Sequence, residues 1–250
     1  MVSIGRGRGW AQNDKNSLPQ PRRLLCTDDV NYIDFFNLIN FVHNKNIEQL
    51  IEEIAKFIDE KTNEENLKDI IDKLHKHALN HRDFGNKLAM IYNYRAVKNI
   101  YDSNNQFLYK YLINQCQMDY ERRKELREEN IVHFHNAIYL FSKYMSGHKY
   151  SKLQFALLDY MEMLLETYSS EDIELFMEQF IEHGKQLQFI FPEKVNELMI
   201  TARQILIKEN ISVTSRQMLL YAIDLESRKF KRLPGSLHNF YKSQLDKIVI

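Results

Sequence analysis

The sequence predicts an all-α fold made of stacked helix pairs, and three of its features indicate this. Proline is absent between Pro21 and Pro192, and only Gly85, Gly147 and Gly184 interrupt that interval, whereas a β-rich chain needs turn residues roughly every 8 to 12 positions. Apolar residues recur at helical spacing. The expected pairs begin near residues 29, 64, 104, 151 and 191, an interval typical of two-helix HEAT repeats. One irregular helical bundle is the alternative.

Each expected helix is identified by its apolar residues. The first two helices contain Val30, Ile33, Phe35, Leu38 and Phe41, and then, after the Asn-rich break at 44–46, Leu50, Ile51, Ile54, Phe57 and Ile58. The next three contain Leu67, Ile70, Ile71, Leu74 and Ala78; Phe84, Leu88, Ile91 and Tyr92; and Leu108, Leu112, Cys116 and Tyr120. Later helices are expected over 131–145, 153–165, 173–181, 195–207 and 218–225, with a short amphipathic one over 237–245.

Capping signals fit these boundaries. Residues 169–172 read SSED, which combines a capping serine with the first-turn acids of a helix start. Thr214 or Ser215 is expected to cap the helix before the last. Gly147 and Gly184 are expected to close helices, because glycine is favoured just after a helix end.

Composition and charge exclude several protein classes. The 250 residues are 44% hydrophobic and 27% charged, which fits neither a disordered chain nor a membrane protein. Lys and Arg total 34, as do Asp and Glu, but residues 1–27 carry five cations and one anion and residues 228–250 carry six cations and one anion. Basic ends around an acidic middle favour anionic partners at the ends and basic partners at the middle.

Cysteine content and apolar runs predict the compartment. Only Cys26 and Cys116 are present, too few for a disulfide framework. No apolar run approaches the roughly 18 to 20 residues of a membrane span, and the first ten residues lack the apolar core of a secretory signal. We therefore expect a cytoplasmic protein, with the nucleus as a second compartment and no membrane partner.

The residue pattern predicts no catalytic or metal site. His77 and His81 share a helix face that could hold zinc, but a third and a fourth ligand are missing nearby, so a polar helix face is expected instead. No glycine-rich phosphate loop joins a strand to a helix, and no nucleophile has the setting of a base at a strand-to-helix turn. We expect no catalytic residue, no metal, no cofactor and no enzyme activity.

Two basic segments are candidate binding sites for RNA or a partner. The run GRGRGW at 5–10 combines a flexible backbone with guanidinium groups for phosphates and an indole for a base, and residues 1–28 are expected to form a disordered basic arm. A second cluster follows residue 227. The candidate residues are Arg6, Arg8, Trp10, Arg228, Lys229, Lys231 and Arg232. The basic residues within 122–127 alternate with glutamates and are expected to be solvated.

Residues 111–126, YLINQCQMDYERRKEL, carry the most specific pattern. They resemble a helix in the middle domain of eukaryotic translation initiation factor 4 gamma, which reads approximately Leu-(Leu/Ile)-Asn-(Arg/Lys)-Cys-Gln-x-(Glu/Asp)-(Phe/Tyr)-Glu. The matching residues are Leu112, Asn114, Cys116, Gln117, Asp119, Tyr120 and Glu121. Gln115 differs, because the family usually has a basic residue there. Residues 75–94, 136–145, 161–187 and 215–230 resemble other segments of the family in the same order.

The resemblance covers residues 29–232 and implies a right-handed α-solenoid of about five HEAT-like antiparallel helix pairs, without a catalytic centre. Residues 233–250 are then a C-terminal helical extension. Within the family, the chain is most similar to small single-domain adaptors of the type that interacts with the histone stem-loop-binding protein. The partners implied are a DEAD-box helicase, a stem-loop-binding or poly(A)-binding protein, an initiation factor or RNA, and a homodimer is expected.

Three functions are therefore considered. The first is an adaptor in mRNA translation or mRNA metabolism, which docks a protein partner on its helical surface. The second is direct binding of single-stranded RNA by the basic ends. The third is a structural homo-oligomeric scaffold.

The family-like helix also carries expectations for single residues. Leu108, Leu112, Cys116 and Tyr120 are expected to form the stripe that packs against other helices. Asn114 and Gln117 are expected to tie neighbouring helices together.

Overall fold

The computed structural model describes residues 27–43, 45–61, 67–98, 100, 108–146 and 151–245. Every regular element in these ranges is a helix. The all-α fold predicted from the scarcity of proline and glycine is confirmed, and the right-handedness of the solenoid stays a prediction. Among the described residues, no helix is both long enough and apolar enough to cross a membrane.

The helices follow one another with short connections. Their bounds are α1 Thr27–Phe41, α2 Ile47–Lys61, α3 Leu67–Asn80, α4 Arg82–Asn93, α5 Arg95–Lys98, α6 Leu108–Glu121, α7 Arg123–Glu129, α8 Ile131–Met145, α9 Ser151–Thr167, α10 Ser170–Ile190, α11 Pro192–Leu206, α12 Val213–Ser227 and α13 Gly235–Gln244.

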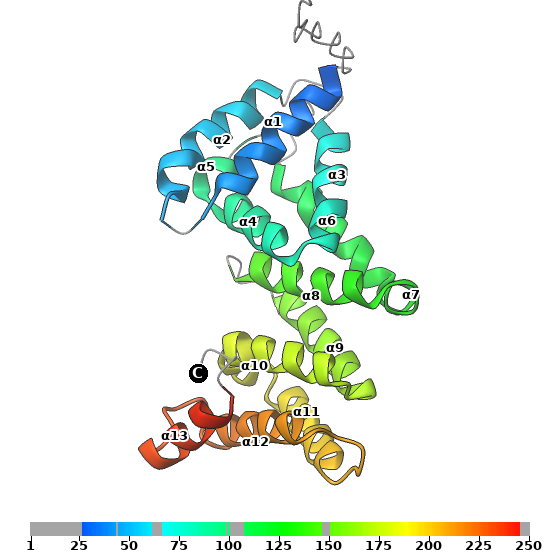
Figure 1. Ribbon diagram of the computed structural model, residues 1–250, viewed down its shortest axis with the longest axis vertical. Helices are drawn as coiled ribbons and strands as arrows, with labels where there is room; N and C mark the ends of the chain where they lie inside the picture. The colour runs from blue at the N-terminus through cyan, green and yellow to red at the C-terminus, as the bar shows by residue number, and fades with distance from the viewer. Residues whose placement is uncertain are drawn as a thin grey trace, which may run out of the picture.

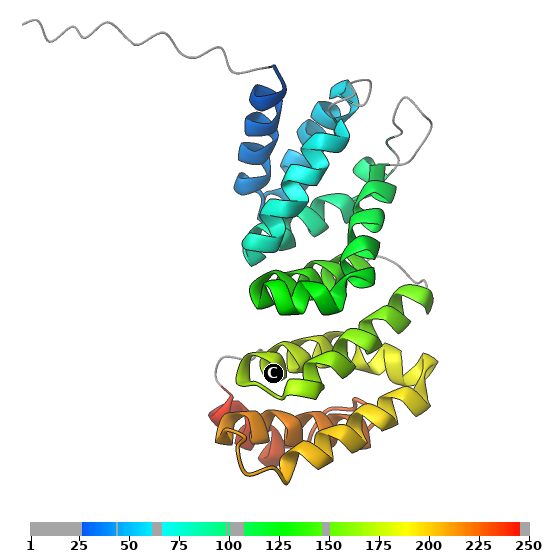
Figure 2. The ribbon, with the colours of Figure 1, turned by 90° about the vertical axis from the view of Figure 1, so that its right-hand side faces the viewer.

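The helices stack as pairs along one axis. Figure 1 shows α1 to α6 at one end, α7 and α8 in the middle and α9 to α13 at the other end. Within a pair, α3 packs on α4 and α9 on α10; between pairs, α4 packs on α8, α9 on α11 and α10 on α12. Figure 2 shows the same succession of layers from the side. Contacts between a helix and its equivalent in the next pair are those expected of stacked repeats.

The first helices of the five pairs begin close to the predicted positions. These helices are α1, α3, α6, α9 and α11, and they start at residues 27, 67, 108, 151 and 192. Two short helices, α5 and α7, were not predicted. The short helix expected over 237–245 is observed as α13, whereas residues 1–26 of the expected basic arm and residues 246–250 lie outside the described part of the chain.

The core runs through the whole stack, and most predicted apolar faces point into it. In α1 the expected face is partly wrong. Phe41 is 70% exposed and Ile33 is 40% exposed, whereas Phe35, Ile39 and Val42 are buried. The periodicity of a helix with apolar residues on several sides does not decide which side meets α3 and α4.

Of the predicted capping positions, Ser169 is confirmed, whereas the cap of α12 and the role of Gly184 need correction. Ser169 caps α10 as expected, since its hydroxyl accepts from the Asp172 backbone N–H at 3.1 Å. The α12 cap is Ser212, which accepts from the Ser215 N–H at 3.0 Å, so neither Thr214 nor Ser215 caps that helix.

Gly184 does not close a helix, because it lies buried inside α10. A Cβ at this position would lie 2.6 Å from Cε1 of Phe230. The glycine therefore permits close packing of a ring rather than a turn. Gly147 lies outside the described residues.

Candidate partner-binding site

The segment that resembles the initiation-factor family forms α6, and its apolar residues pack as expected. Leu112 and Cys116 are buried and Tyr120 is half-buried. Burial raises the pKa of the Cys116 thiol, and the charge of Asp119 raises it further, so the thiol is protonated at neutral pH. Leu108, the fourth residue of the expected stripe, begins the helix, and its side chain lies outside the described part of the structure.

The expectation for Asn114 and Gln117 is wrong. Both side chains are exposed, and the Gln117 carboxamide donates to Glu121 of its own helix at 2.7 Å. On a helix, residues four apart share a face, and here that face is turned to solvent. These two residues do not tie α6 to its neighbours.

Other polar residues of α6 make those contacts instead. Asp119 Oδ2 lies 2.7 Å from His75 Nε2 of α3, and Gln115 donates to Asp72 of α3 at 2.5 Å. Tyr120 donates its hydroxyl proton to Asp159 of α9. Gln115 is the position at which the sequence departs from the family pattern, and that departure was the one available signal that this residue has a particular role.

The basic residues at 122–127 have different environments. Arg122 is exposed and lies 3.4 Å from Glu129, and Lys124 is exposed, so these two are solvated as expected. Arg123 stacks over the Tyr120 ring at 4.2 Å. Arg127 is the exception to the prediction, because its side chain is only 13% exposed.

Arg127 belongs to a buried polar network that joins α7, α8, α9 and α10. It donates to Asp172 at 2.9 Å and to the Met163 carbonyl at 2.5 Å. His135 Nε2 lies 2.6 Å from Asp172. Burial raises the pKa of Asp172, but bonds from His135 and Thr167 and the charge of Arg127 outweigh burial and hold the pKa below its usual value. The network is a structural bridge between helix pairs.

The predicted C-terminal basic residues lie together in the turn between α12 and α13. Arg228, Lys229, Lys231 and Arg232 are all exposed. The turn has an unusual backbone, with φ of 52° at Lys229 and 56° at Phe230, and the Phe230 ring packs on Gly184 and on Phe180, 5.2 Å from the latter ring. An aromatic anchor thus holds a turn that displays four cations. Arg6, Arg8 and Trp10 lie outside the described residues.

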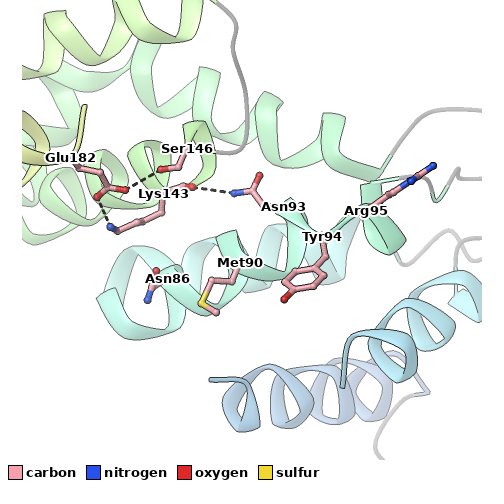
Figure 3. Close-up of a pocket in the computed structure, with 8 residues that line it drawn as sticks. All are labelled: Asn86, Met90, Asn93, Tyr94, Arg95, Lys143, Ser146 and Glu182. Atoms are coloured by element: carbon pink, nitrogen blue, oxygen red, sulfur yellow. Dashed lines mark hydrogen bonds and ion pairs between the residues drawn. The ribbon is translucent and has the colours of Figure 1, made fainter. Parts of the chain in front are cut away.

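A pocket of about 450 Å³ opens between α4, α5, α8 and α10. The residues that line it are Asn86, Met90, Asn93, Tyr94, Arg95, Lys143, Ser146 and Glu182. Figure 3 shows the side chains of α4 and α5 following one another from Asn86 to Arg95, with Arg95 at the opposite end from Lys143 and Glu182. Sequence reasoning missed this site, because its residues come from four helices and match no motif.

Polar contacts fix one end of this pocket. Lys143 Nζ lies 2.5 Å from Glu182 Oε2, and Ser146 donates to the other carboxylate oxygen at 3.0 Å. Burial raises the pKa of Glu182, but these bonds and the Lys143 charge outweigh it, so the pKa lies below its usual value. Asn93 Nδ2 donates to the Lys143 carbonyl at 3.1 Å. The ion pair therefore bridges α8 and α10, and Asn93 joins α4 to them.

A second pocket of about 450 Å³ lies between α6, α8 and α9 and has a largely apolar wall that includes Ile113, Phe141 and Leu153. A third, around the turn between α3 and α4, contains His77 and His81, whose rings are 4.3 Å apart. Burial and the charge of His81 lower the pKa of His77. No group of three or more metal-ligating side chains occurs in the described ranges.

No protein-family model matches the chain, and no curated protein sequence matches it.

Proposed function

We propose that the protein is a non-catalytic adaptor of mRNA translation or mRNA metabolism, which docks a protein partner on its stacked helices. The observation that carries the proposal is the succession of helix pairs, with a pocket that opens between α4, α5, α8 and α10. Such stacks give extended binding surfaces. The link to mRNA rests on the resemblance of residues 111–126 to the initiation-factor family, and a cytoplasmic location is part of the same proposal.

The proposal is tested by purifying the tagged full chain from cytosolic extract treated with ribonuclease, followed by mass spectrometry. A DEAD-box helicase, a stem-loop-binding or poly(A)-binding protein, or an initiation factor is expected in a complex that survives the nuclease. Recovery of the chain alone, or only of copies of itself, would contradict the adaptor function and favour a homo-oligomeric scaffold.

A second candidate function, direct binding of single-stranded RNA, is supported by the basic turn between α12 and α13. Its four exposed cations are held in place by Phe230, and cations near a polyanion bind by displacing its counterions. If all four contact phosphates, the log of the affinity for a labelled oligouridine falls against the log of the salt concentration with a slope of about −3. Binding that is absent, or independent of salt, would exclude this function.

A further inference from the structure

The pocket between α4, α5, α8 and α10 has a regular row of side chains along one wall. Asn86, Met90 and Asn93 are spaced at three and four residues, so they lie on one face of α4. A rise of about 1.5 Å per residue places Asn86 and Asn93 roughly 10 Å apart along the helix axis. An extended peptide covers that distance in about three residues. A peptide segment of about this length can therefore lie along the wall.

The hydrogen-bonding state of these carboxamides indicates what kind of ligand they fit. A carboxamide both donates and accepts, as a peptide group does. Asn86 has no hydrogen-bond partner among the described residues. Asn93 is oriented by its bond to the Lys143 carbonyl, and its buried Oδ1 accepts nothing from the described part of the chain. The Asn93 oxygen is enclosed by protein and out of reach of a ligand, so the half-buried Asn86 carboxamide is the group of this wall that can pair with a ligand backbone.

Charge and apolar surface define the rest of the ligand. Lys143 is neutralised by Glu182, whereas Arg95 is exposed and forms no ion pair with another described residue. The half-buried side chains of Met90 and Tyr94 lie between these charged groups along the wall. The pocket thus offers one apolar contact area and, at its far end, one cation without a counter-charge.

We propose that this pocket binds an extended peptide segment of a partner protein, with one apolar side chain against Met90 and Tyr94 and one acidic side chain against Arg95. The inference rests on the proposed adaptor function and names the chemistry of the partner. It differs from the expectation that the acidic middle of the chain meets basic partners, because the charges that line the pocket, rather than the net charge of the segment, face the ligand.

The test uses two synthetic peptides and the full chain labelled with ¹⁵N. Both peptides are Gly-Ser dodecamers with one Phe, and two residues further on, on the same face of an extended chain, one carries Glu and the other Lys. The Glu peptide is expected to shift the side-chain amide signals of Asn86 and Asn93. The Lys peptide is expected to bind about fivefold more weakly, which is the effect of one partly exposed charge pair. Asn86→Ala is expected to weaken binding of the Glu peptide.

A charge reversal separates the proposal from unspecific binding. Arg95→Glu is expected to reverse the preference, so that the Lys peptide binds better than the Glu peptide. Lys124→Glu is the matched control, because it makes the same change of net charge at an exposed position on α7 and should leave the preference unchanged. The proposal fails if neither peptide shifts the Asn86 and Asn93 signals, or if the Arg95→Glu variant keeps the original preference.

The outcome is distinguishable from that of the proposed function. If the peptide preference reverses but the nuclease-treated purification recovers no protein of the mRNA machinery, the pocket is a peptide site and the adaptor role in mRNA metabolism is wrong. If the machinery is recovered equally by the wild-type and Arg95→Glu chains and no peptide binds, the adaptor role stands and the pocket inference is wrong.

Discussion

Gly184 lies in α10 at the place where the Phe230 ring approaches the backbone. Helix propensity alone would favour alanine here by about 1 kcal/mol, but a Cβ would lie 2.6 Å from Phe230 Cε1, so the ring has to move. Overpacking costs about 1 to 3 kcal/mol, and we expect Gly184→Ala to lower the free energy of unfolding in urea. Gly235→Ala is the control, since a Cβ there meets nothing within 4 Å. Equal effects of the two substitutions would contradict the packing role.

Lys229 has a left-handed backbone, with φ of 52°. A residue with a Cβ pays roughly 1 kcal/mol for this conformation, and glycine does not. We therefore expect Lys229→Gly to raise the free energy of unfolding by about 0.5 to 1 kcal/mol. Lys231→Gly removes the same charge without relief of a positive φ and should not stabilise the chain. If the basic turn binds RNA, both variants lose affinity for oligouridine to a similar extent, whatever their stability.

At the scale of the helices, the network around Asp172 joins α10 to α7, α8 and α9. The pKa of Asp172 lies below its usual value of 3.8. A carboxyl whose pKa is lowered by folding adds stability above the pKa of its unfolded form, and that stability disappears as the pH falls through the folded value. Wild-type stability should therefore decrease more steeply below about pH 4 than that of Asp172→Asn.

The same substitution is expected to lower stability at neutral pH by about 3 kcal/mol, because it leaves the nearly buried Arg127 with only the exposed carboxylate of Glu166, 3.9 Å away, as a counter-charge. Chemical denaturation at a series of pH values measures both effects. The Asp69→Asn variant is a control, since Asp69 forms an exposed pair with Lys73 in one helix. Parallel pH profiles of the wild-type and Asp172→Asn chains would show that the network does not stabilise the fold.

The starts of the helices could be predicted from the sequence because they depend on residues that are close together in the chain. The rhythm of apolar residues and the rarity of proline and glycine placed the first helices of the pairs within a few residues, and the Ser169 cap follows from four adjacent residues, 169–172. The roles of Gly184 and Arg127 were not predictable, since each depends on a partner distant in the sequence, Phe230 and Asp172 respectively. The pocket near Arg95 was missed for the same reason.

Over the whole molecule, the helices are stacked so that each pair contacts mainly its neighbours (Figures 1 and 2). Stability in such a stack is distributed over the pairs and the interfaces between them. We expect Gly184→Ala to reduce amide hydrogen-exchange protection in α10 and α12 more than in α3 and α4. Equal loss of protection at both ends would indicate one cooperative unit rather than a stack of separable pairs.

The central claim is that the chain docks a protein partner of the mRNA machinery. Its most direct test is ribonuclease-treated purification of three full-length chains, the wild type, Arg95→Glu and Lys124→Glu, with the bound proteins quantified by mass spectrometry. The account predicts that the wild type and Lys124→Glu recover the same helicase, initiation factor or RNA-binding protein, and that Arg95→Glu recovers markedly less. Absence of any such protein from all three purifications would contradict it.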